Sequence, residues 1–378
     1  MSRTVFLHVG VAKTGTTYLQ RLLSTNRDLL RDHGVLYPGE RPNAHFLASM
    51  DLREAGFGGY HYPGAPGMWQ KLVAEANRFP RTTVISHETL ARARPNTIAK
   101  AVGDFDTGDV RVVVTTRDLG RQIPAVWQET VKNRNVQTYS QFLEAVFEAT
   151  TEDGTTKLNS FWRPQDVPRL VRRWLENVGD GNVIVVTVPP AGADRQELWR
   201  RFATALELPD LPYSFDTGVG NASLGTVQSE LLRRMNRQIP EQVEWATYER
   251  RVKREFVERR LSSLPSSDRI AVPDRWREQV GVVADRMTRE LAELPIRVIG
   301  DLEDLRPQFA EPAGPLPDDI SDSRLLKAAL RVLADLAVVP GAPAPRPPAP
   351  QPQTQPQPAP QSPSDVSRVG RLKQKLQP

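Results

Sequence analysis

Short runs of β-branched and aliphatic residues recur along the first 300 residues and alternate with stretches of helical periodicity. The apolar runs predict strands at residues 4–9, 82–86, 110–116, 182–188 and 296–299. Runs such as TTVIS, VRVVVTT and NVIVVTV are almost continuously β-branched. That pattern is typical of strands buried on both faces of a parallel sheet.

Helical periodicity predicts the segments between these strands. The predicted helices cover residues 16–30, 122–133, 139–149 and 167–177, and residues 226–294 are helical and highly charged. Alternating strands and helices predict an α/β domain with a mainly parallel central sheet. The charged stretch predicts a C-terminal helical part of the same domain.

The pattern changes after residue 312. Residues 321–339 predict one helix, with Ser321 or Asp322 as its N-cap. Residues 340–363 are close to half proline, interleaved with Gln and Ala, and predict a disordered, polyproline-like spacer. The chain then divides into a domain at residues 1–310, a linker and helix at 311–339, and a Pro/Gln-rich tail at 340–378 with a short basic end. The alternative for the tail is a docking arm for an assembly partner.

Composition narrows the classes of function. Lys and Arg number 50 against 45 Asp and Glu, so the net charge is +5, but the basic residues are spread along the chain. A nucleotide or sulfated ligand fits this diffuse excess, and no nucleic-acid partner is predicted. The lack of cysteine excludes disulfides, thiolate metal sites and cysteine nucleophiles. With no signal peptide and no run of about 18 apolar residues, a cytoplasmic protein without a membrane span is predicted.

Residues 8–17, HVGVAKTGTT, are the most informative segment and are called the phosphate loop below. They lie between a predicted strand and a predicted helix, where unpaired N–H groups and the helix dipole favour an anion. Gly15 permits tight curvature, and Lys13 supplies a mobile positive charge. A Walker A loop ends in Gly-Lys-Ser/Thr, whereas here Lys13 precedes Gly15.

The order Lys-Thr-Gly-Thr-Thr, followed by an aromatic residue, resembles the 5'-phosphosulfate loop of sulfotransferases that use PAPS (3'-phosphoadenosine 5'-phosphosulfate). The resemblance implies a P-loop-type three-layer αβα domain that takes PAPS as co-substrate and needs no metal. It implies that Lys13 contacts the bridging oxygen of the donor and that Tyr18 replaces the family's adenine-stacking aromatic. The remaining loop residues, which hold the 5'-phosphate, are Thr14, Gly15, Thr16 and Thr17.

A second nucleotide contact is predicted where the strand at 110–116 ends. By the same resemblance, Arg117 binds the 3'-phosphate, which suits the bidentate geometry of a guanidinium. The family's serine on the following helix would fall near Ala125, so Gln122 is the predicted replacement, with Arg121 and Gln128 as alternatives. The family's late Arg-Lys-Gly loop is not visible, and its nearest counterpart is NASLG at residues 221–225.

Sulfuryl transfer to a hydroxyl requires a general base. His87 and Glu88 rank first, because they follow a strand predicted to lie beside the phosphate-loop strand, and ligands of open α/β sheets bind at the carboxyl ends of strands. Other members of the family that the loop resembles use a glutamate about two to three dozen residues after the loop lysine. Glu40 falls in that window and ranks third, and His45, which follows close behind, ranks second. His8, within the first strand, is predicted to be structural.

Residues 56–69, GFGGYHYPGAPGMW, predict a long loop near the site. Phe57, Tyr60, Tyr62 and Trp69 would there be available to an apolar or sugar acceptor. The alternative is a loop packed on the surface by its own aromatic side chains.

Together these features predict metal-independent, in-line transfer of a sulfuryl group from PAPS. The acceptor would be a hydroxyl or amine of a small molecule, carbohydrate or lipid. An ATP-dependent P-loop phosphotransferase is the first alternative, against which the position of Lys13 and the lack of a clear Walker B aspartate count. A non-catalytic nucleotide-binding scaffold is the second, which the missing serine and late loop keep open.

Overall fold

The computed structural model describes residues 3–217, 224–265, 268–310 and 315–338. One compact unit runs from Met1 to Asp335, past the boundary predicted at residue 310. Of the second unit, residues 336–378, the structure describes only the last residues of one helix. The predicted tail at 340–378 and residues 221–223 of the NASLG segment lie outside the described residues.

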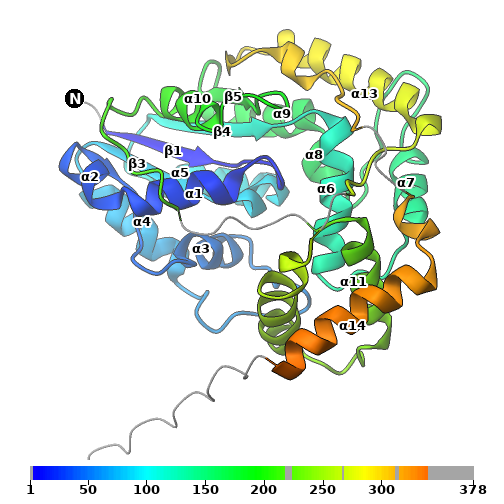
Figure 1. Cartoon of the computed structure of the whole chain (residues 1–378). Helices are drawn as coiled ribbons and strands as arrows, with labels where there is room; N and C mark the ends of the chain where they lie inside the picture. The colour runs from blue at the N-terminus through cyan, green and yellow to red at the C-terminus, as the bar shows by residue number, and fades with distance from the viewer. Residues whose placement is uncertain (1–2, 218–223, 266–267, 311–314, 339–378) are drawn as a thin grey trace, which may run out of the picture. The chain divides into compact units, whose positions relative to one another are not determined.

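A six-stranded sheet forms the centre of the first unit, with strand order β2-β3-β1-β4-β5-β6 and every pairing parallel (Figure 1). The strands are β1 (Thr4–His8), β2 (Val35–Leu36), β3 (Thr82–Ser86), β4 (Val110–Thr116), β5 (Val183–Thr187) and β6 (Arg297–Ile299). The five predicted strands are all present. The short strand β2 was not predicted, because two apolar residues carry no readable period.

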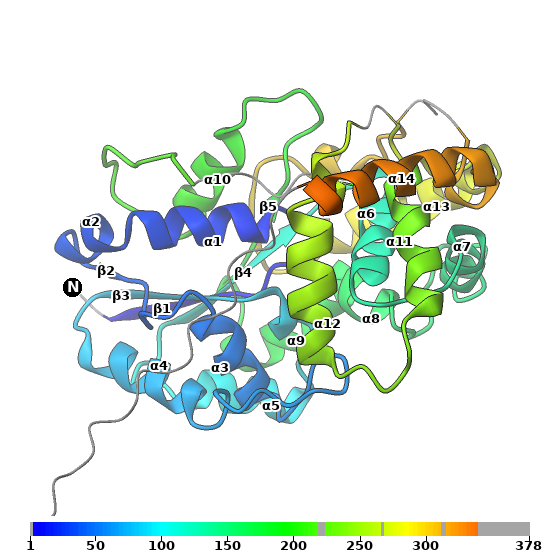
Figure 2. The same ribbon diagram turned by 60° about the horizontal axis from the view of Figure 1, so that its bottom comes forward.

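Helices cover both faces of the sheet, as Figure 2 shows. One face carries α1 (Thr16–Thr25), α2 (Arg27–Asp32) and α10 (Glu197–Ala205), and the other α3 (Ala44–Leu52), α4 (Met68–Arg78), α5 (Pro95–Gly103) and α9 (Val167–Val178). Successive strand side chains point to opposite faces. Phe6 therefore packs in the core of the first face, whereas Val5 and Leu7 pack in that of the second. The predicted three-layer αβα fold is confirmed.

The predicted helix at residues 16–30 is divided at Asn26. The Asn26 side-chain amide donates to Leu22 O at 2.9 Å and to Ser214 O at 2.9 Å. Its backbone departs from helical geometry, with φ −99° and ψ 20°. Because an asparagine side chain competes for backbone groups, α1 ends at this residue and α2 begins after it.

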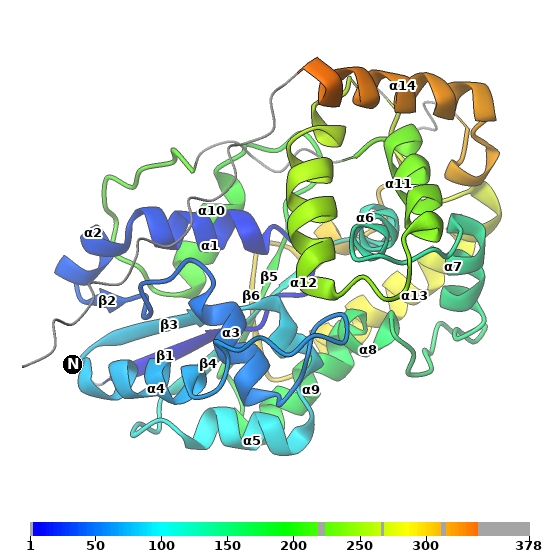
Figure 3. The same cartoon turned by 90° about the horizontal axis from the view of Figure 1, so that it is seen from below.

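A group of helices lies beyond the carboxyl ends of the strands (Figure 3). It comprises α6 (Leu119–Lys132), α7 (Tyr139–Phe147), α8 (Trp162–Gln165), α11 (Thr226–Gln238), α12 (Trp245–Tyr248), the π-helix η2 (Glu249–Glu258), α13 (Asp274–Ala292) and α14 (Asp322–Val338). Short 3₁₀ turns are η1 (Glu88–Arg92), η3 (Leu261–Ser263), η4 (Leu302–Leu305) and η5 (Pro317–Asp319). The predicted C-terminal helical part is thus confirmed, and it faces the strand ends where a ligand would lie.

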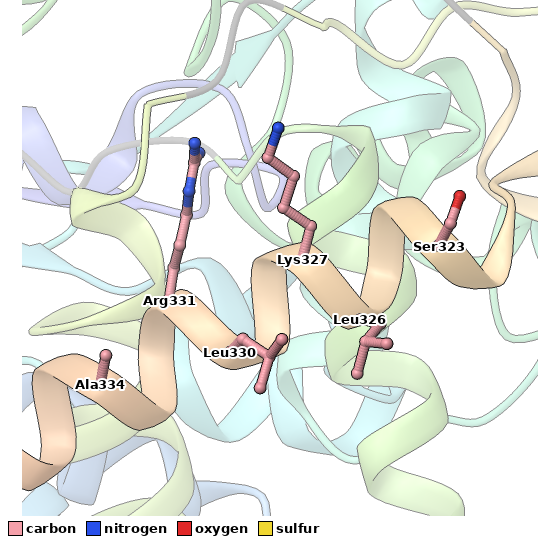
Figure 4. Close-up of a pocket in the computed structure, with 6 residues that line it drawn as sticks. All are labelled: Ser323, Leu326, Lys327, Leu330, Arg331 and Ala334. Carbon is pink, nitrogen blue, oxygen red and sulfur yellow. The ribbon is translucent and has the colours of Figure 1, made fainter.

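The helix α14 packs on this group through one side. Leu325 and Val332 are buried, at 5% and 2% exposure, and Arg234 pairs with Asp322 at 2.6 Å. Figure 4 shows Leu326 and Leu330 projecting from the side of α14 opposite Lys327 and Arg331. Leu326 and Leu330 thus remain exposed on a side of α14 that does not pack on the core.

Candidate functional site

The phosphate loop leaves β1 and enters α1 through two left-handed residues. Lys13 has φ 72° and Gly15, the N-cap of α1, has φ 85°. A positive φ is uncommon for a residue other than glycine, so the backbone at Lys13 is strained. Gly10 is required for a different reason: a Cβ there would lie 2.5 Å from Thr115 Oγ1 and 2.6 Å from His8 Nε2.

Hydrogen bonds to β4 fix the shape of the loop. Val9 N donates to Val113 O at 2.8 Å, and Val11 N donates to Thr115 O at 3.3 Å. The buried Thr14 hydroxyl donates to Val11 O at 2.6 Å and lies 2.6 Å from Thr115 Oγ1. The hydroxyl of Thr14, which was predicted as a phosphate ligand, is thus hydrogen-bonded within the protein, to the loop and to β4.

The start of α1 is open to an anion. No side chain caps the helix at Gly15, so its first-turn N–H groups keep their capacity to donate. Thr16 is buried and Thr17 is exposed beside them. Leu198 of α10 covers the turn, since its Cδ2 lies 2.5 Å from where a Cβ on Gly15 would be. Uncapped N–H donors and the helix dipole at this point favour a negative charge.

His8 joins the ends of three strands beneath the loop. Its Nδ1 lies 2.7 Å from Ser86 Oγ on β3, and its Nε2 lies 3.2 Å from Thr115 Oγ1 on β4. The ring is fully buried, and burial lowers the pKa of His8 to about 3. His8 is therefore neutral and structural, as its place within the strand predicted.

Lys13 forms an ion pair that the sequence reasoning missed. Its Nζ lies 3.1 Å from Glu129 Oε2 on α6, and Lys253 Nζ from η2 lies 3.1 Å from Glu129 Oε1. Burial alone would raise the pKa of Glu129, but the charges of Lys13, Lys253 and Lys132 lower it to about 2. The sequence did contain one indication of this contact. Glu129 follows Gln122 by two helical turns, so the two side chains lie on the same face of the predicted helix.

Arg117 and Gln122 meet the phosphate loop from the start of α6. Arg117 Nη1 donates to Lys13 O at 3.3 Å, and Gln122 Nε2 donates to Ala12 O at 2.5 Å. Arg117 Nε and Gln122 Oε1 are buried and have no hydrogen-bond partner among the described residues. Burial, with the charge of Arg121, lowers the pKa of Arg117 to about 10. Such unsatisfied buried groups are what an absent ligand would satisfy.

The other polar residues considered for this contact are engaged elsewhere. Asp118 caps α6 through Arg121 N at 3.0 Å and also binds the Arg121 side chain, so it is not the partner of Arg117. Gln128 Nε2 donates to Leu224 O at 2.5 Å and to Ser229 Oγ at 3.2 Å. Of the three side chains considered for this contact, Gln122 is therefore the one that binds the backbone of the phosphate loop.

His87 and Glu88 stand at the carboxyl end of β3, next to β1. His87 Nδ1 accepts from Thr89 N at 3.2 Å, which places the proton of the neutral ring on Nε2. Glu88 Oε2 accepts from Gln20 Nε2 of α1 at 3.3 Å, and the Glu88 side chain is 29% exposed. Burial works against ionisation, but the positive charge of His87 in its protonated form, with the hydrogen bonds that Glu88 accepts, lowers the pKa of Glu88. Glu88 is therefore a carboxylate at neutral pH.

His45 and Glu40 are placed differently. His45 Nδ1 accepts from Ser86 N at 3.1 Å and its Nε2 donates to Pro38 O at 2.9 Å. The ring stacks on Tyr37 at 4.2 Å, and burial lowers the pKa of His45 to about 3. Both ring nitrogens are thus hydrogen-bonded to backbone groups, one on β3 and one just after β2. Glu40 is exposed in the loop before α3.

The aromatic loop at residues 56–67 lies between α3 and α12. Tyr62 packs against Phe46 at 4.9 Å, Phe57 against Trp245 at 5.1 Å, and Phe46 against His87 at 5.3 Å. These rings, with Tyr60 beside Tyr62, form an aromatic wall next to His87. Trp245 Nε1 also donates to the Tyr62 hydroxyl at 2.8 Å, which ties the loop to α12.

Trp69 does not belong to this wall. It lies in the first turn of α4, is 1% exposed, and donates from Nε1 to Asp104 Oδ2 at 2.7 Å. The prediction that Trp69 is available to an acceptor is wrong, because the loop ends at Gly67 and the helix buries the ring. Tyr18 is half-buried and packs against the same hydrophobic cluster as Leu198, and burial with the charge of Asp194 raises its pKa.

Comparison with known proteins gives one structural neighbour. No family model matches the chain, and no curated protein matches it. The crystal structure of a sulfotransferase from Alicyclobacillus acidocaldarius is similar at a TM-score of 0.35 and 16% identity, covering 58% of this chain and 87% of that one. A TM-score of 0.35 is too low to establish a shared fold or a shared function.

Two features are absent from the described residues. Within the described ranges, no group of three or more His, Cys, Asp and Glu side chains could hold a metal ion. No helix in the described part of the chain is long and apolar enough to cross a membrane.

The buried histidines predict how stability depends on pH. His8 and His45 titrate near 3 in the folded chain but near the ordinary 6.5 when unfolded, so below pH 6.5 the unfolded state binds more protons. We expect the free energy of unfolding to fall by up to about 1.4 kcal/mol per pH unit for each histidine, down to about pH 3. Urea denaturation of wild type and His45→Gln at pH 7.5 and pH 5.5 measures the effect. The variant should lose part of the pH dependence, whereas His61→Gln, at an exposed position, should keep it. Equal pH dependence in wild type and His45→Gln would contradict the assignment.

Proposed function

We propose that this protein transfers a sulfuryl group from PAPS to a hydroxyl or amine of a small-molecule acceptor. The observation that supports this most strongly is the phosphate loop. Lys13 sits in a strained left-handed turn directly before the uncapped N-terminus of α1. Backbone donors, a helix dipole and one mobile ammonium group meet there, which suits a phosphosulfate group.

The donor would be bound at two points on the same edge of the sheet. Its 5'-phosphosulfate would lie on the N–H groups of Gly15, Thr16 and Thr17, beside Lys13. Its 3'-phosphate would take the buried Nε of Arg117, which otherwise has no partner in the described residues. A guanidinium offers two parallel donors to phosphate, so this contact would satisfy Arg117 without loss of its charge.

Transfer would proceed by in-line displacement at sulfur. The acceptor oxygen forms a bond to sulfur, the bond from sulfur to the 5'-phosphate oxygen breaks, and PAP (3'-phosphoadenosine 5'-phosphate) leaves with that electron pair. Lys13 would leave Glu129 and stabilise the charge that develops on the leaving oxygen. The acceptor's proton would pass to Glu88, since Glu88 is ionised while the Nδ1 of His87 already accepts a backbone N–H. His87 would orient the acceptor through Nε2–H.

One observation counts against a magnesium-dependent phosphotransferase. In a Walker A loop the hydroxyl after the lysine binds Mg²⁺. Here the corresponding Thr14 hydroxyl is buried and donates to Val11 O at 2.6 Å. A non-catalytic scaffold would also bind the nucleotide, but it would have no need of a general base such as Glu88.

The donor site is tested by calorimetric titration of PAP in the presence of EDTA. We expect metal-independent binding that is at least about 10-fold weaker in Lys13→Ala and in Arg117→Ala, because each removes one phosphate contact of about 1.4 kcal/mol or more. Lys71→Ala, at an exposed position on α4, is the matched control and should bind as wild type. Absence of PAP binding, together with ATP binding that requires magnesium, would replace this proposal by the phosphotransferase.

The general base is tested by release of PAP from PAPS with water or an added acceptor. Glu88→Gln should lower the rate by about 100-fold or more while PAP affinity stays unchanged, since a positioned base contributes about that much. The deprotonated form is the active one and its pKa lies below the ordinary 4.5, so the rate should be independent of pH above about pH 5. Glu40→Gln, an exposed carboxylate, should retain wild-type turnover. A Glu88→Gln enzyme with full activity would exclude Glu88 as the base.

A further inference from the structure

One carboxylate lies among three ammonium groups beside the phosphate loop. Glu129 of α6 pairs with Lys13 of the loop and with Lys253 of η2, each at 3.1 Å. Lys253 Nζ also donates to Asn133 Oδ1 at 2.7 Å. The three paired side chains are 21–31% exposed, so solvent and ligands reach them. Three separate elements thus bring positive charge to one accessible point.

Lys132 is the unpaired member of this cluster. It is half-buried at the end of α6 and has no hydrogen-bond or ion-pair partner among the residues that the structure describes. Burial and the charges of Lys13 and Lys253 lower the pKa of Lys132, although Glu129 and Glu258 act in the opposite direction. An anion near Lys132 would relieve the repulsion between these ammonium groups.

The cluster lies on the far side of Lys13 from the proposed nucleotide contacts. Gln122 touches the loop at Ala12 O, whereas Glu129 touches Lys13 Nζ. These two residues of α6 are seven positions apart, which is about 10 Å along a helix. Arg117 stands before the first turn of the same helix, so Lys13 Nζ, held at Glu129, lies toward the opposite end of α6 from Arg117.

The aromatic wall connects to the same cluster through η2. Tyr62 donates from its hydroxyl to Glu249 Oε2 at 3.1 Å, and Glu249 begins the π-helix that carries Lys253. His87 stands at the other end of the wall, next to Phe46. An acceptor that reaches His87 and Glu88 along this wall would lie close to η2, on which Lys253 follows Glu249 by four residues.

We propose that the acceptor carries an anionic group, a phosphate, sulfate or carboxylate, bound by Lys132 and Lys253. This rests on the proposed transfer from PAPS. When Lys13 leaves Glu129 for the donor, Glu129 keeps Lys253, and no carboxylate among the described residues forms an ion pair with Lys132. An anionic substituent on the acceptor supplies a counter-charge and sets its hydroxyl toward Glu88. The lysine cluster thus selects an anionic acceptor over a neutral one of the same shape.

The test compares a charged and a neutral hydroxyl compound on PAP-saturated protein. PAP occupies the phosphate loop, so the second anion can bind only elsewhere. Calorimetry with glucose 6-phosphate and with glucose should show at least about 10-fold tighter binding of the phosphate ester. Lys132→Gln should reduce that binding at least about 5-fold and leave PAP affinity unchanged, whereas Lys132→Arg should retain it. Lys71→Gln controls for the general loss of one positive charge.

The outcomes separate this inference from the proposed function. Normal PAP binding with equal affinity for glucose 6-phosphate and glucose, or with glucose 6-phosphate binding that Lys132→Gln leaves unchanged, overturns the anionic acceptor site alone. If PAP does not bind, the proposed function fails, and the titration is repeated on the free protein. Binding of glucose 6-phosphate that Lys132→Gln removes would then still support an anion site, and no such binding would overturn both.

Discussion

A buried chain of hydrogen bonds across the ends of β3, β1 and β4 holds the phosphate loop in place, and the proposed site depends on the position of that loop. Ser86, His8, Thr115 and Thr14 follow one another at 2.6–3.2 Å, and all are buried. A charged histidine could not be accommodated there, so the chain requires a neutral ring. Through it the phosphate loop is held rigidly against the sheet, and Gly10 must remain without a side chain.

The strain at Lys13 and its ion pair with Glu129 belong together. A left-handed lysine persists only where surrounding contacts determine the backbone, and here the bonds to β4 do so. Its ammonium group is then held at Glu129 by an interaction that is accessible at about 30% exposure, so a competing phosphosulfate can replace it at modest cost. A rigid backbone and an exchangeable side chain are what a transfer site for an anionic donor needs.

The sequence predicted the fold where local pattern decides structure. The strands β3 and β4 were located to the residue, because β-branched runs bounded by polar residues allow one interpretation. The sequence also predicted that the phosphate loop, Arg117 and Glu88 lie at the carboxyl ends of neighbouring strands. It could not find Lys253 or the engagement of both nitrogens of His45, because these contacts join residues far apart in the chain. Trp69 was misjudged since the end of a loop and the first turn of a helix share the same composition.

In the proposed site, the phosphate loop and Arg117 bind the two phosphates of one nucleotide. A crystal structure of the protein grown with PAP and without magnesium tests it most directly. We expect the 5'-phosphate on the backbone N–H groups of Gly15–Thr17 and the 3'-phosphate on the Arg117 guanidinium, with Lys13 released from Glu129. A PAP molecule bound elsewhere, or a phosphate loop still closed by the Lys13–Glu129 pair with PAP present, would contradict it.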